Sequence, residues 1–359
     1  MATGRDGADD RSLVPPMRAA GRPLGVVLRD LLAPAGPGSL LPPGTLLELA
    51  EAADRLGYDS VWFPEGSGRE LLSMLGAAAA LAVRVRLGSG IMPIHSRPPA
   101  LAAMAAATLA DLSGGRFILG LGVGHRRLVE AGYGRRYRRP VDAMREYVAI
   151  VRAALAGHTV RFPGRVFRVE AFRLEAAPQH AVPIYLAALG ERMLRLAGEI
   201  ADGVILNWAT PASIRRAAAV VRDAAARAGR DPGDVRVVCY VRVAVTSRAP
   251  EAWGVVRRLL ATYAAMPAYA QALGAAGFGA EVARIGAAWQ AGGPDAAARA
   301  VPEALLAQMA VVGSAADVRE GLNAYHEAGA DLVAVYPFPV GDDGAAAMRA
   351  TIEGLAGSG

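Results

Sequence analysis

The sequence predicts an α/β protein, a TIM (β/α)8 barrel with an inserted helical region between strands 7 and 8. Short β-branched or apolar runs alternate with longer segments of helical period, which is typical of βα units around a parallel sheet. Eight such runs occur, the number that a closed barrel needs. The 359 residues also suit one barrel of roughly 250 residues plus an insertion.

The eight expected strands are spread over most of the chain. They are residues 24–28, 60–63, 85–91, 116–121, 183–187, 203–206, 235–244 and 332–336. Several of them are preceded by the same kind of segment. A helical pattern ends, a short turn containing glycine and an acidic or small residue follows, and the apolar run of the strand begins, as in RLGYDSVWF and EIADGVIL. This rhythm is typical of βα barrels, in which a tight turn leads into each strand.

Capping residues predict where two of the helices begin. Thr45 precedes LLELAEAADRLG, so a helix is expected to start there and to end at Gly57. Ser314, followed by Asp317, predicts the start of a later helix that ends at Gly329.

Three segments depart from the alternation. Residues 160–169 alternate around a Pro-Gly pair and predict a β-hairpin. Residues 1–20 lack the apolar core of a signal peptide and are expected to form a flexible tail before a barrel unit of 21–359. Residues 249–312 are too long for a simple connection and are expected to form a helical insertion. That insertion could cover the barrel mouth, provide a dimer surface, or add a helical layer without direct chemistry.

Composition excludes several kinds of chemistry. All 39 basic residues are arginine, against 33 acidic residues, so no lysine can form a Schiff base, anchor pyridoxal phosphate or bind phosphate in a Walker motif. The single cysteine, Cys239, excludes intramolecular disulfides and sites with two thiolate ligands. No metal-binding pattern is visible, and the longest apolar stretches fall short of the roughly 20 residues that span a bilayer. A cytoplasmic protein is expected.

The carboxyl ends of barrel strands hold the working groups of this fold, so they are the first candidates for a site. Glycine and small residues dominate at these strand ends. A flat ligand lying across the mouth would require them, because the backbone must approach such a ligand closely. Gly120, Gly122 and Gly124 could be mistaken for a dinucleotide fingerprint, but His125 stands where the third glycine belongs. The alternative explanation for these three glycines is tight packing at the strand end.

A second glycine-containing turn follows the fifth strand. Ala187, Ala188, Leu189 and Gly190 lead directly into a helix beginning at Glu191. The exposed amides of a helix start attract phosphate, although an ordinary strand-to-helix turn has the same pattern. Asn207, at the end of the next strand, offers a side-chain amide to the same region.

Three titratable residues are the candidates for proton chemistry. His125 combines a strand-end position with a side chain that exchanges protons near neutral pH. His95 follows another strand end, and both histidines could instead be structural. Glu65 ends the second strand and could be a general base, a hydrogen-bond acceptor or a cap. Structural or solvated roles are expected for the remaining histidines, His158, His180 and His326.

A basic run follows the fourth strand, with two tyrosines interleaved. The six arginines are Arg126, Arg127, Arg135, Arg136, Arg138 and Arg139. Such a run is often a solvated face, and no nucleic-acid motif accompanies it. Binding of the anionic tail of a small molecule is preferred, because the run is expected near the barrel mouth.

These motifs resemble the bacterial-luciferase-like (LLM class) flavin and deazaflavin oxidoreductases, particularly the coenzyme F420-dependent branch. The resemblance rests on the order and spacing of four segments from about residue 24 to the C-terminus, outside most of the insertion. They are GYDSVWFPE (57–65), RLGSGIMPIHSRPPALAAMAAATLADLSGGRFILGLGVGH (86–125), PIYLAALGERMLRLAGEIADGVILNW (183–208) and VVGSAADVREGLNAYHEAGADLVAVYP (311–337).

The resemblance implies where a cofactor would bind. The cofactor ring would lie over the mouth, with its phosphate near the ends of the fifth and sixth strands and a non-prolyl cis peptide at Gly90–Ile91 behind the ring. The residues expected to bind it are Gly90, Ile91, Gly122, Gly124, Ala187, Ala188, Leu189, Gly190, Glu191, Asn207 and Trp208. A homodimer is expected by analogy with relatives.

The resemblance also implies hydride transfer between coenzyme F420 and a small organic substrate, with no nucleic acid or membrane as partner. His125, standing where a deazaflavin-dependent dehydrogenase has a glutamate, would donate a proton to substrate, Glu65 would orient substrate or ring, and His95 is a third catalytic candidate. Gly66 replaces a histidine that several relatives carry. The arginine-rich mouth favours the polyglutamate tail of F420 over FMN. An FMN-dependent monooxygenase and a non-catalytic cofactor-binding barrel are the alternatives; substrate and reaction direction stay open.

Overall fold

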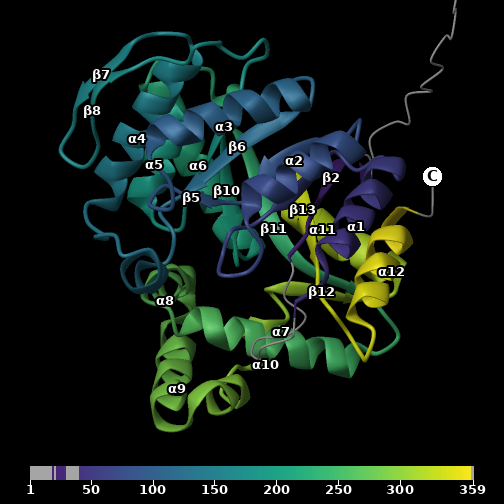
Figure 1. Ribbon diagram of the computed structural model, residues 1–359. Coiled ribbons are helices and arrows are strands. Elements are labelled where there is room, and N and C mark those ends of the chain that lie inside the picture. Colours follow the sequence, from purple (N-terminus) through teal and green to yellow (C-terminus); the bar gives the residue numbers. More distant parts are fainter. Residues whose placement is uncertain (1–17, 20–21, 30–39, 357–359) are drawn as a thin grey trace, which may run out of the picture.

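The computed structural model describes residues 18–19, 22–29 and 40–356, and its central feature is a closed parallel barrel (Figure 1). Each barrel strand pairs in parallel with the next one along the chain, and the last pairs with the first. The strands are β2 (Arg22–Val27), β3 (Ser60–Phe63), β4 (Arg86–Ser89), β6 (Phe117–Gly122), β9 (Ile184–Ala187), β10 (Gly203–Asn207), β11 (Arg236–Val245) and β13 (Leu332–Pro337). The predicted TIM barrel is confirmed.

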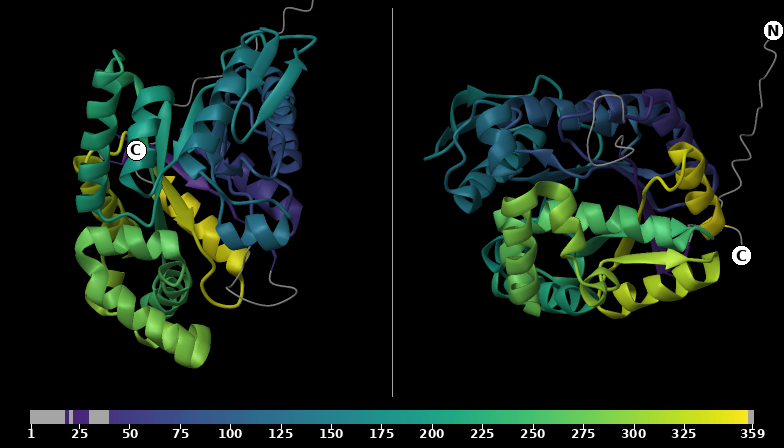
Figure 2. Two further views of the ribbon diagram at one scale, coloured as in Figure 1. Left: turned by 90° about the vertical axis from the view of Figure 1, so that its left-hand side faces the viewer. Right: turned by 90° about the horizontal axis from the view of Figure 1, so that it is seen from below.

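Helices surround this barrel, mostly one after each strand (Figures 1 and 2). They are α1 (Pro43–Arg55), α2 (Leu71–Leu81), α3 (Pro99–Leu112), α4 (Pro140–Leu155), α5 (Glu191–Ile200), α6 (Pro211–Arg227), α11 (Ala315–Glu327) and α12 (Gly344–Ala356). None of the helices in the described ranges combines the length and the apolar character that crossing a membrane requires.

The two helix starts predicted from capping residues have different outcomes. Helix α1 begins at Pro43 with Pro42 as its N-cap, so the prediction that Thr45 caps it is wrong. Proline is favoured in the first turn of a helix, where its missing N–H needs no partner. The helix can therefore begin at Pro43, on the N-terminal side of Thr45. The prediction for Ser314 is confirmed: its hydroxyl accepts from the Asp317 amide, and the Asp317 carboxylate accepts from the Ser314 amide.

The segments outside the barrel alternation are also mostly as expected. Strands β7 (Val160–Pro163) and β8 (Arg168–Phe172) pair antiparallel and form the predicted hairpin. Of the predicted tail, only β1 (Arg18–Ala19) is described, and it pairs antiparallel with β2; residues 1–17 and 20 lie outside the described residues. The third predicted strand, 85–91, is shorter than expected, because β4 spans Arg86–Ser89; a separate short strand, β5 (Met92–Pro93), follows and pairs with β6.

The insertion after β11 consists of helices and one strand. It comprises α7 (Ala249–Ala264), α8 (Pro267–Leu273), α9 (Gly279–Arg299), α10 (Glu303–Leu306) and β12 (Ala310–Gly313). Strand β12 returns to β11 and pairs in parallel with its carboxyl half, from Arg242 to Val245. Buried insertion side chains pack against Trp208 and Phe338, which follow β10 and β13. The inserted helices therefore lie over the carboxyl end of the barrel, on one side of the molecule (Figure 2).

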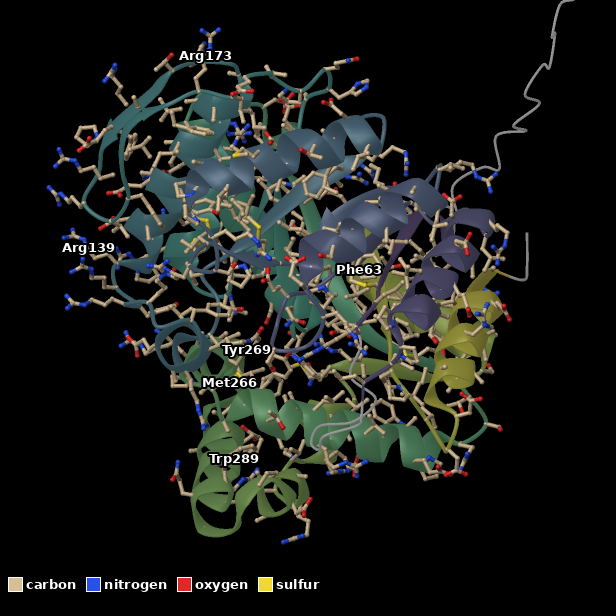
Figure 3. All side chains as sticks on the ribbon, in the orientation of Figure 1. Phe63, Arg139, Arg173, Met266, Tyr269 and Trp289 are labelled. Carbon is tan, nitrogen blue, oxygen red and sulfur yellow. The ribbon has the colours of Figure 1, made fainter. Side chains whose placement is uncertain are left out.

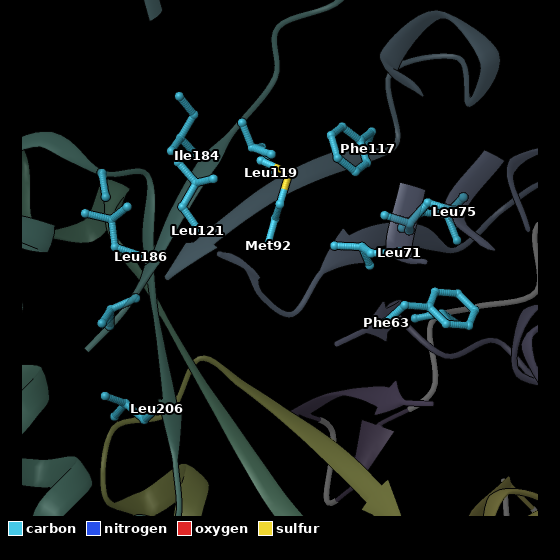
Figure 4. Close-up of a cluster of buried hydrophobic side chains, with 14 of the residues drawn as sticks. Phe63, Leu71, Leu75, Met92, Phe117, Leu119, Leu121, Ile184, Leu186 and Leu206 are labelled. Atoms are coloured by element: carbon cyan, nitrogen blue, oxygen red, sulfur yellow. The ribbon is translucent and has the colours of Figure 1, made fainter. Parts of the chain in front are cut away.

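Two apolar layers hold the barrel together. The larger lies between the strands and the surrounding helices, where Phe63, Leu71 and Phe117 are buried (Figure 4). The smaller layer fills the inside of the barrel with residues such as Val27, Trp62, Ile118, Ile205, Tyr240 and Ala334. Side chains alternate along a strand, so the residues two positions further on, Arg29, Asn207, Arg242 and Tyr336, form the next inward layer, at the carboxyl end.

Candidate functional site

The inward layer at the barrel mouth contains two arginines. Arg242 of β11 is only 3% exposed, and its Nη1 donates a hydrogen bond to Asn207 Oδ1. Its guanidinium carbon lies 4.0 Å from the ring centroid of Trp208 and 4.4 Å from that of Tyr336. Arg29, which follows β2, donates from Nη1 to the Tyr263 hydroxyl over 3.2 Å. Strand β13 lies between the two strands that carry the arginines.

The charges of this layer act on one another. Burial lowers the pKa of Arg242, because the charged guanidinium is removed from water. Burial also opposes ionisation of the Tyr263 hydroxyl, but Arg29 and Arg242 outweigh it and hold that pKa below its ordinary value. Among the described residues, tyrosines rather than carboxylates surround both arginines.

Two tyrosines of the insertion complete the mouth. Tyr263 comes from α7 and Tyr269 from α8, and their rings pack edge to face 4.8 Å apart. The Tyr269 hydroxyl accepts from Asn207 Nδ2 over 2.8 Å, and Figure 3 shows Tyr269 where the insertion meets the barrel. These contacts favour a covering role for the insertion over a helical layer without contact to the mouth.

His125 lies beside these tyrosines. It follows β6, is exposed, and its ring centroid is 5.9 Å from that of Tyr269 and 6.2 Å from that of Tyr263. Solvent reaches the ring, yet nearby protein atoms and, secondarily, the charge of Arg29 lower the pKa of His125. The imidazole is therefore predominantly neutral at pH 7.

Glu65 is held in an ion pair. Its Oε2 accepts from Arg97 Nη1 at 2.6 Å, and the same guanidinium also pairs with Glu70, the N-cap of α2. Burial raises the pKa of Glu65, and Arg97 only partly offsets this. Of the three roles left open by the sequence, this arrangement favours the hydrogen-bond acceptor.

His95 belongs to a different group of residues. It is 9% exposed, and its ring centroid lies 5.7 Å from that of Tyr137, in the loop after β6. Burial lowers the pKa of His95, and its Nε2 has no hydrogen-bond partner among the described residues. The structure thus places His95 with that loop, whereas His125 lies with the insertion tyrosines.

Small residues shape the backbone at the mouth. The Gly90–Ile91 peptide bond is cis, as the resemblance implied. A Cβ at Gly90 would collide with the Tyr240 hydroxyl, and one at Gly122 would collide with the Ile91 side chain. Gly124 has φ +71°, a conformation that favours glycine. The Tyr240 hydroxyl and the Trp208 indole N–H are buried without a hydrogen-bond partner among the described residues, so a bound molecule could use both.

The start of α5 offers backbone amides rather than side chains. Gly190 is the N-cap and provides no side-chain cap, and a Cβ there would meet nothing within 4 Å. The Glu191 carboxylate pairs with Arg195 along the helix, so only its amide suits an anion. The Ala188 amide donates to Ile205 O, and both ends of the Asn207 amide are used by Arg242 and Tyr269. A phosphate at this position would therefore use the backbone of Leu189, Gly190 and Glu191.

The basic run after β6 faces solvent. All six of its arginines are exposed, and Figure 3 shows Arg139 at the edge of the molecule. Arg139 pairs with Asp142, and Arg126 pairs with Glu130 while its guanidinium lies 5.1 Å from the Tyr137 ring centroid. The run adjoins helix η1 (Leu128–Gly132) and is available to an anionic tail outside the mouth.

Sequence comparison finds a related family over most of the chain. Residues 24–332 match the model of the luciferase-like monooxygenase family. A putative coenzyme F420-dependent oxidoreductase of Mycobacterium tuberculosis is 31% identical over 315 residues, covering 82% of this chain and 91% of that protein. A 5,10-methylenetetrahydromethanopterin reductase of Methanolobus tindarius is 33% identical over 204 residues, covering 56% of this chain and 62% of its own length.

Solved structures share the fold. A coenzyme F420-dependent tetrahydromethanopterin reductase from Methanopyrus kandleri matches 93% of this chain and 98% of its own, with a TM-score of 0.77 and 23% identity. An F420-dependent secondary alcohol dehydrogenase, solved with an F420–acetone adduct, matches 93% of this chain and 99% of its own, with a TM-score of 0.73 and 19% identity. At these identities the structural matches describe the fold alone.

Proposed function

The chain belongs to the luciferase-like monooxygenase family, and from that premise we propose that it is a coenzyme F420-dependent oxidoreductase. It would transfer a hydride between the deazaflavin and a small organic substrate. The observation that carries the proposal is the match to the protein of Mycobacterium tuberculosis named as a putative coenzyme F420-dependent oxidoreductase, which extends over 82% of this chain. The mouth is consistent with that match, because it combines glycines at the strand ends with buried donors that have no hydrogen-bond partner among the described residues.

The residues around Gly90 fit a flat ring. Because Gly90 and Gly122 have no side chains, the Tyr240 hydroxyl and the Ile91 side chain pack directly against their backbone. The unpartnered hydroxyl of Tyr240 lies against Gly90 and is available to a ring carbonyl or nitrogen. When bound, the deazaflavin would supply two electrons and a proton as a hydride. The chain's own residues would bind the ring, exclude water beneath the insertion and exchange the accompanying proton.

We assign the proton exchange to His125. A neutral imidazole accepts a proton, so its lowered pKa favours removal of a proton from a substrate hydroxyl or amine at neutral pH. The predicted donation of a proton is the same step in the reverse direction. Glu65, fixed by Arg97, would position the strand-end backbone, because the Glu65 amide donates to Ile91 O over 3.3 Å.

Titration of the purified protein with oxidised F420 and with FMN tests the cofactor assignment. We expect saturable F420 binding at micromolar concentrations and much weaker binding of FMN, because the exposed arginines of the run that follows His125 favour the more anionic tail. Micromolar FMN binding without an F420 response would reject the proposal. The FMN-dependent monooxygenase is then the better assignment, and consumption of oxygen driven by reduced FMN would identify it.

Replacing Gly190 with valine tests the phosphate position. The residue has φ −103° and ψ 156°, which valine adopts readily, and a Cβ would meet no atom of the described residues within 4 Å. We expect unchanged thermal stability and F420 affinity weakened about tenfold, because the branched side chain would occupy the space next to the first amides of α5. Fluorescence titration measures the affinity, and Gly190→Ala is the matched control with a smaller loss. If the valine variant binds F420 with wild-type affinity, the cofactor phosphate does not bind at the start of α5.

A further inference from the structure

We propose that Arg29 and Arg242 form a subsite for an oxyanion, a carboxylate or phosphate group, carried by the substrate. The assignment to the substrate rests on the proposed function, whereas the oxyanion site itself rests on the residues of the mouth. The two arginines share one inward layer and the same partner, Tyr263 of the insertion.

The first argument is the burial of charge without a carboxylate. Arg242 is 3% exposed, and neither arginine forms an ion pair with an acidic side chain among the described residues. A buried charge is normally paired, because removal from water is costly. Elsewhere in the described chain, by contrast, Arg97 and Arg86 each pair with a carboxylate. The missing negative charge is what an anionic ligand would supply.

The second argument is the geometry of the guanidinium groups. Arg242 is held between the Trp208 and Tyr336 rings, at 4.0 and 4.4 Å, and donates to Asn207, so its plane is fixed. A fixed guanidinium suits bidentate binding of a carboxylate or phosphate better than a flexible ammonium does. Arg29 is positioned by its 3.2 Å hydrogen bond to Tyr263.

The third argument is the presence of further unpartnered donors around the same layer. The Trp208 indole N–H belongs to the ring that stacks on Arg242, and it has no hydrogen-bond partner among the described residues. The Tyr240 ring packs edge to face against that of Tyr336 at 6.4 Å, and its hydroxyl has no hydrogen-bond partner in the part of the chain that the structure describes. The indole N–H beside the Arg242 guanidinium suits an oxyanion, and the Tyr240 hydroxyl remains the donor proposed for the cofactor ring.

The position separates this subsite from the proposed cofactor phosphate. Arg29 and Arg242 belong to the side of the barrel formed by β2, β13 and β11, whereas Gly190 follows β9. His125 lies beside the same two tyrosines that contact this layer. A substrate anchored by its anion would therefore hold its remaining atoms near the group proposed to exchange the proton.

Thermal-shift and calorimetric titrations of the protein without cofactor test the proposal, with succinate and inorganic phosphate as probes. We expect both to raise the melting temperature, and Arg29→Gln and Arg242→Gln each to weaken probe binding at least about tenfold. Arg29→Lys should restore part of the affinity. Arg116→Gln is the matched control: this half-buried arginine bonds to Val85 O next to the amino end of β6, and probe binding should not change.

F420 titration of the same variants separates the two proposals. Unchanged F420 affinity in Arg29→Gln, together with lost probe binding, supports a substrate subsite. Probe binding that is unaltered in both glutamine variants overturns the proposal, and so does competition of the probes with F420. If wild-type protein binds the probes through these arginines but never binds F420, the oxyanion site stands and the proposed function fails. Should Arg242→Gln not fold, Arg29→Gln and Arg29→Lys decide the outcome.

Discussion

His125→Ala is expected to lower turnover by about 10²–10⁴-fold while changing F420 affinity little. The reason is that the imidazole is exposed at the mouth beside Tyr263 and Tyr269, where it can reach a substrate, and no other described histidine contacts those tyrosines. Steady-state kinetics under F420 saturation, combined with F420 titration, measure the two effects separately. His158→Ala, an exposed histidine before the β7–β8 hairpin, is the matched control and should retain full turnover. Equal turnover by the His125 variant and its parent would remove the proton-exchange role.

The pH profile gives the same residue a second, independent test. The pKa of His125 is lowered, so the neutral form that accepts a proton is fully present above that pKa and is lost as pH falls through it. In the direction of substrate oxidation, kcat/KM should decline on the acid side, below the ordinary histidine pKa of about 6.5. In the reverse direction the protonated form is needed, so the rate should fall as pH rises through the same pKa. If this pH dependence disappears in His125→Ala, it is caused by the titration of His125.

Gly88→Ala is expected to destabilise the fold by about 3 kcal/mol, because a methyl group would overlap the ring of Trp62. Trp62 is fully buried inside the barrel, and its indole N–H donates to Ser60 Oγ over 2.9 Å, so a shift of the ring would break this hydrogen bond. Denaturant unfolding followed by circular dichroism measures the change as a shift of the midpoint.

Gly76→Ala provides the control for this substitution. Gly76 lies within α2, where a Cβ would meet nothing within 4 Å. Alanine favours a helix over glycine, so this variant should be more stable by about 0.5–1 kcal/mol. The two substitutions add the same methyl group with opposite expected signs. A stable Gly88 variant would contradict the close packing of the barrel interior.

The barrel could be predicted from sequence because each strand is a short apolar run before or after a helical pattern. Ser60–Phe63 is correct to the residue, and Leu332–Pro337 differs from its prediction by one residue. Local patterns were less reliable where two signals competed. At α1, Thr45 suggested the N-cap, but the helix begins at Pro43 with Pro42 as its N-cap, three residues earlier.

The mouth could be predicted only in part, because its polar residues come from different strands. Glycines at strand ends and His125 stand out in the sequence. Arg242 does not, since it lies within the apolar run VRVVCYVRVAV, and its inward direction depends on the register with Ala334 and Tyr336 of β13. Alternation from Tyr240 to Arg242 was the one available signal. Tyr263 and Tyr269 lie within the predicted insertion, but their contacts with Arg29 and Asn207 depend on tertiary packing that the sequence pattern does not reveal.

The return of β12 to β11 also bears on how such a protein diversifies. The inserted segment leaves β11 near Ala249 and comes back as a strand beside that same β11, so both of its ends are anchored on one element. Exchange of everything between those anchors would leave the eight-stranded ring and its glycine-lined rim covalently unchanged. Transfer of this inserted segment from one homologue to another is therefore a direct way to change substrate specificity.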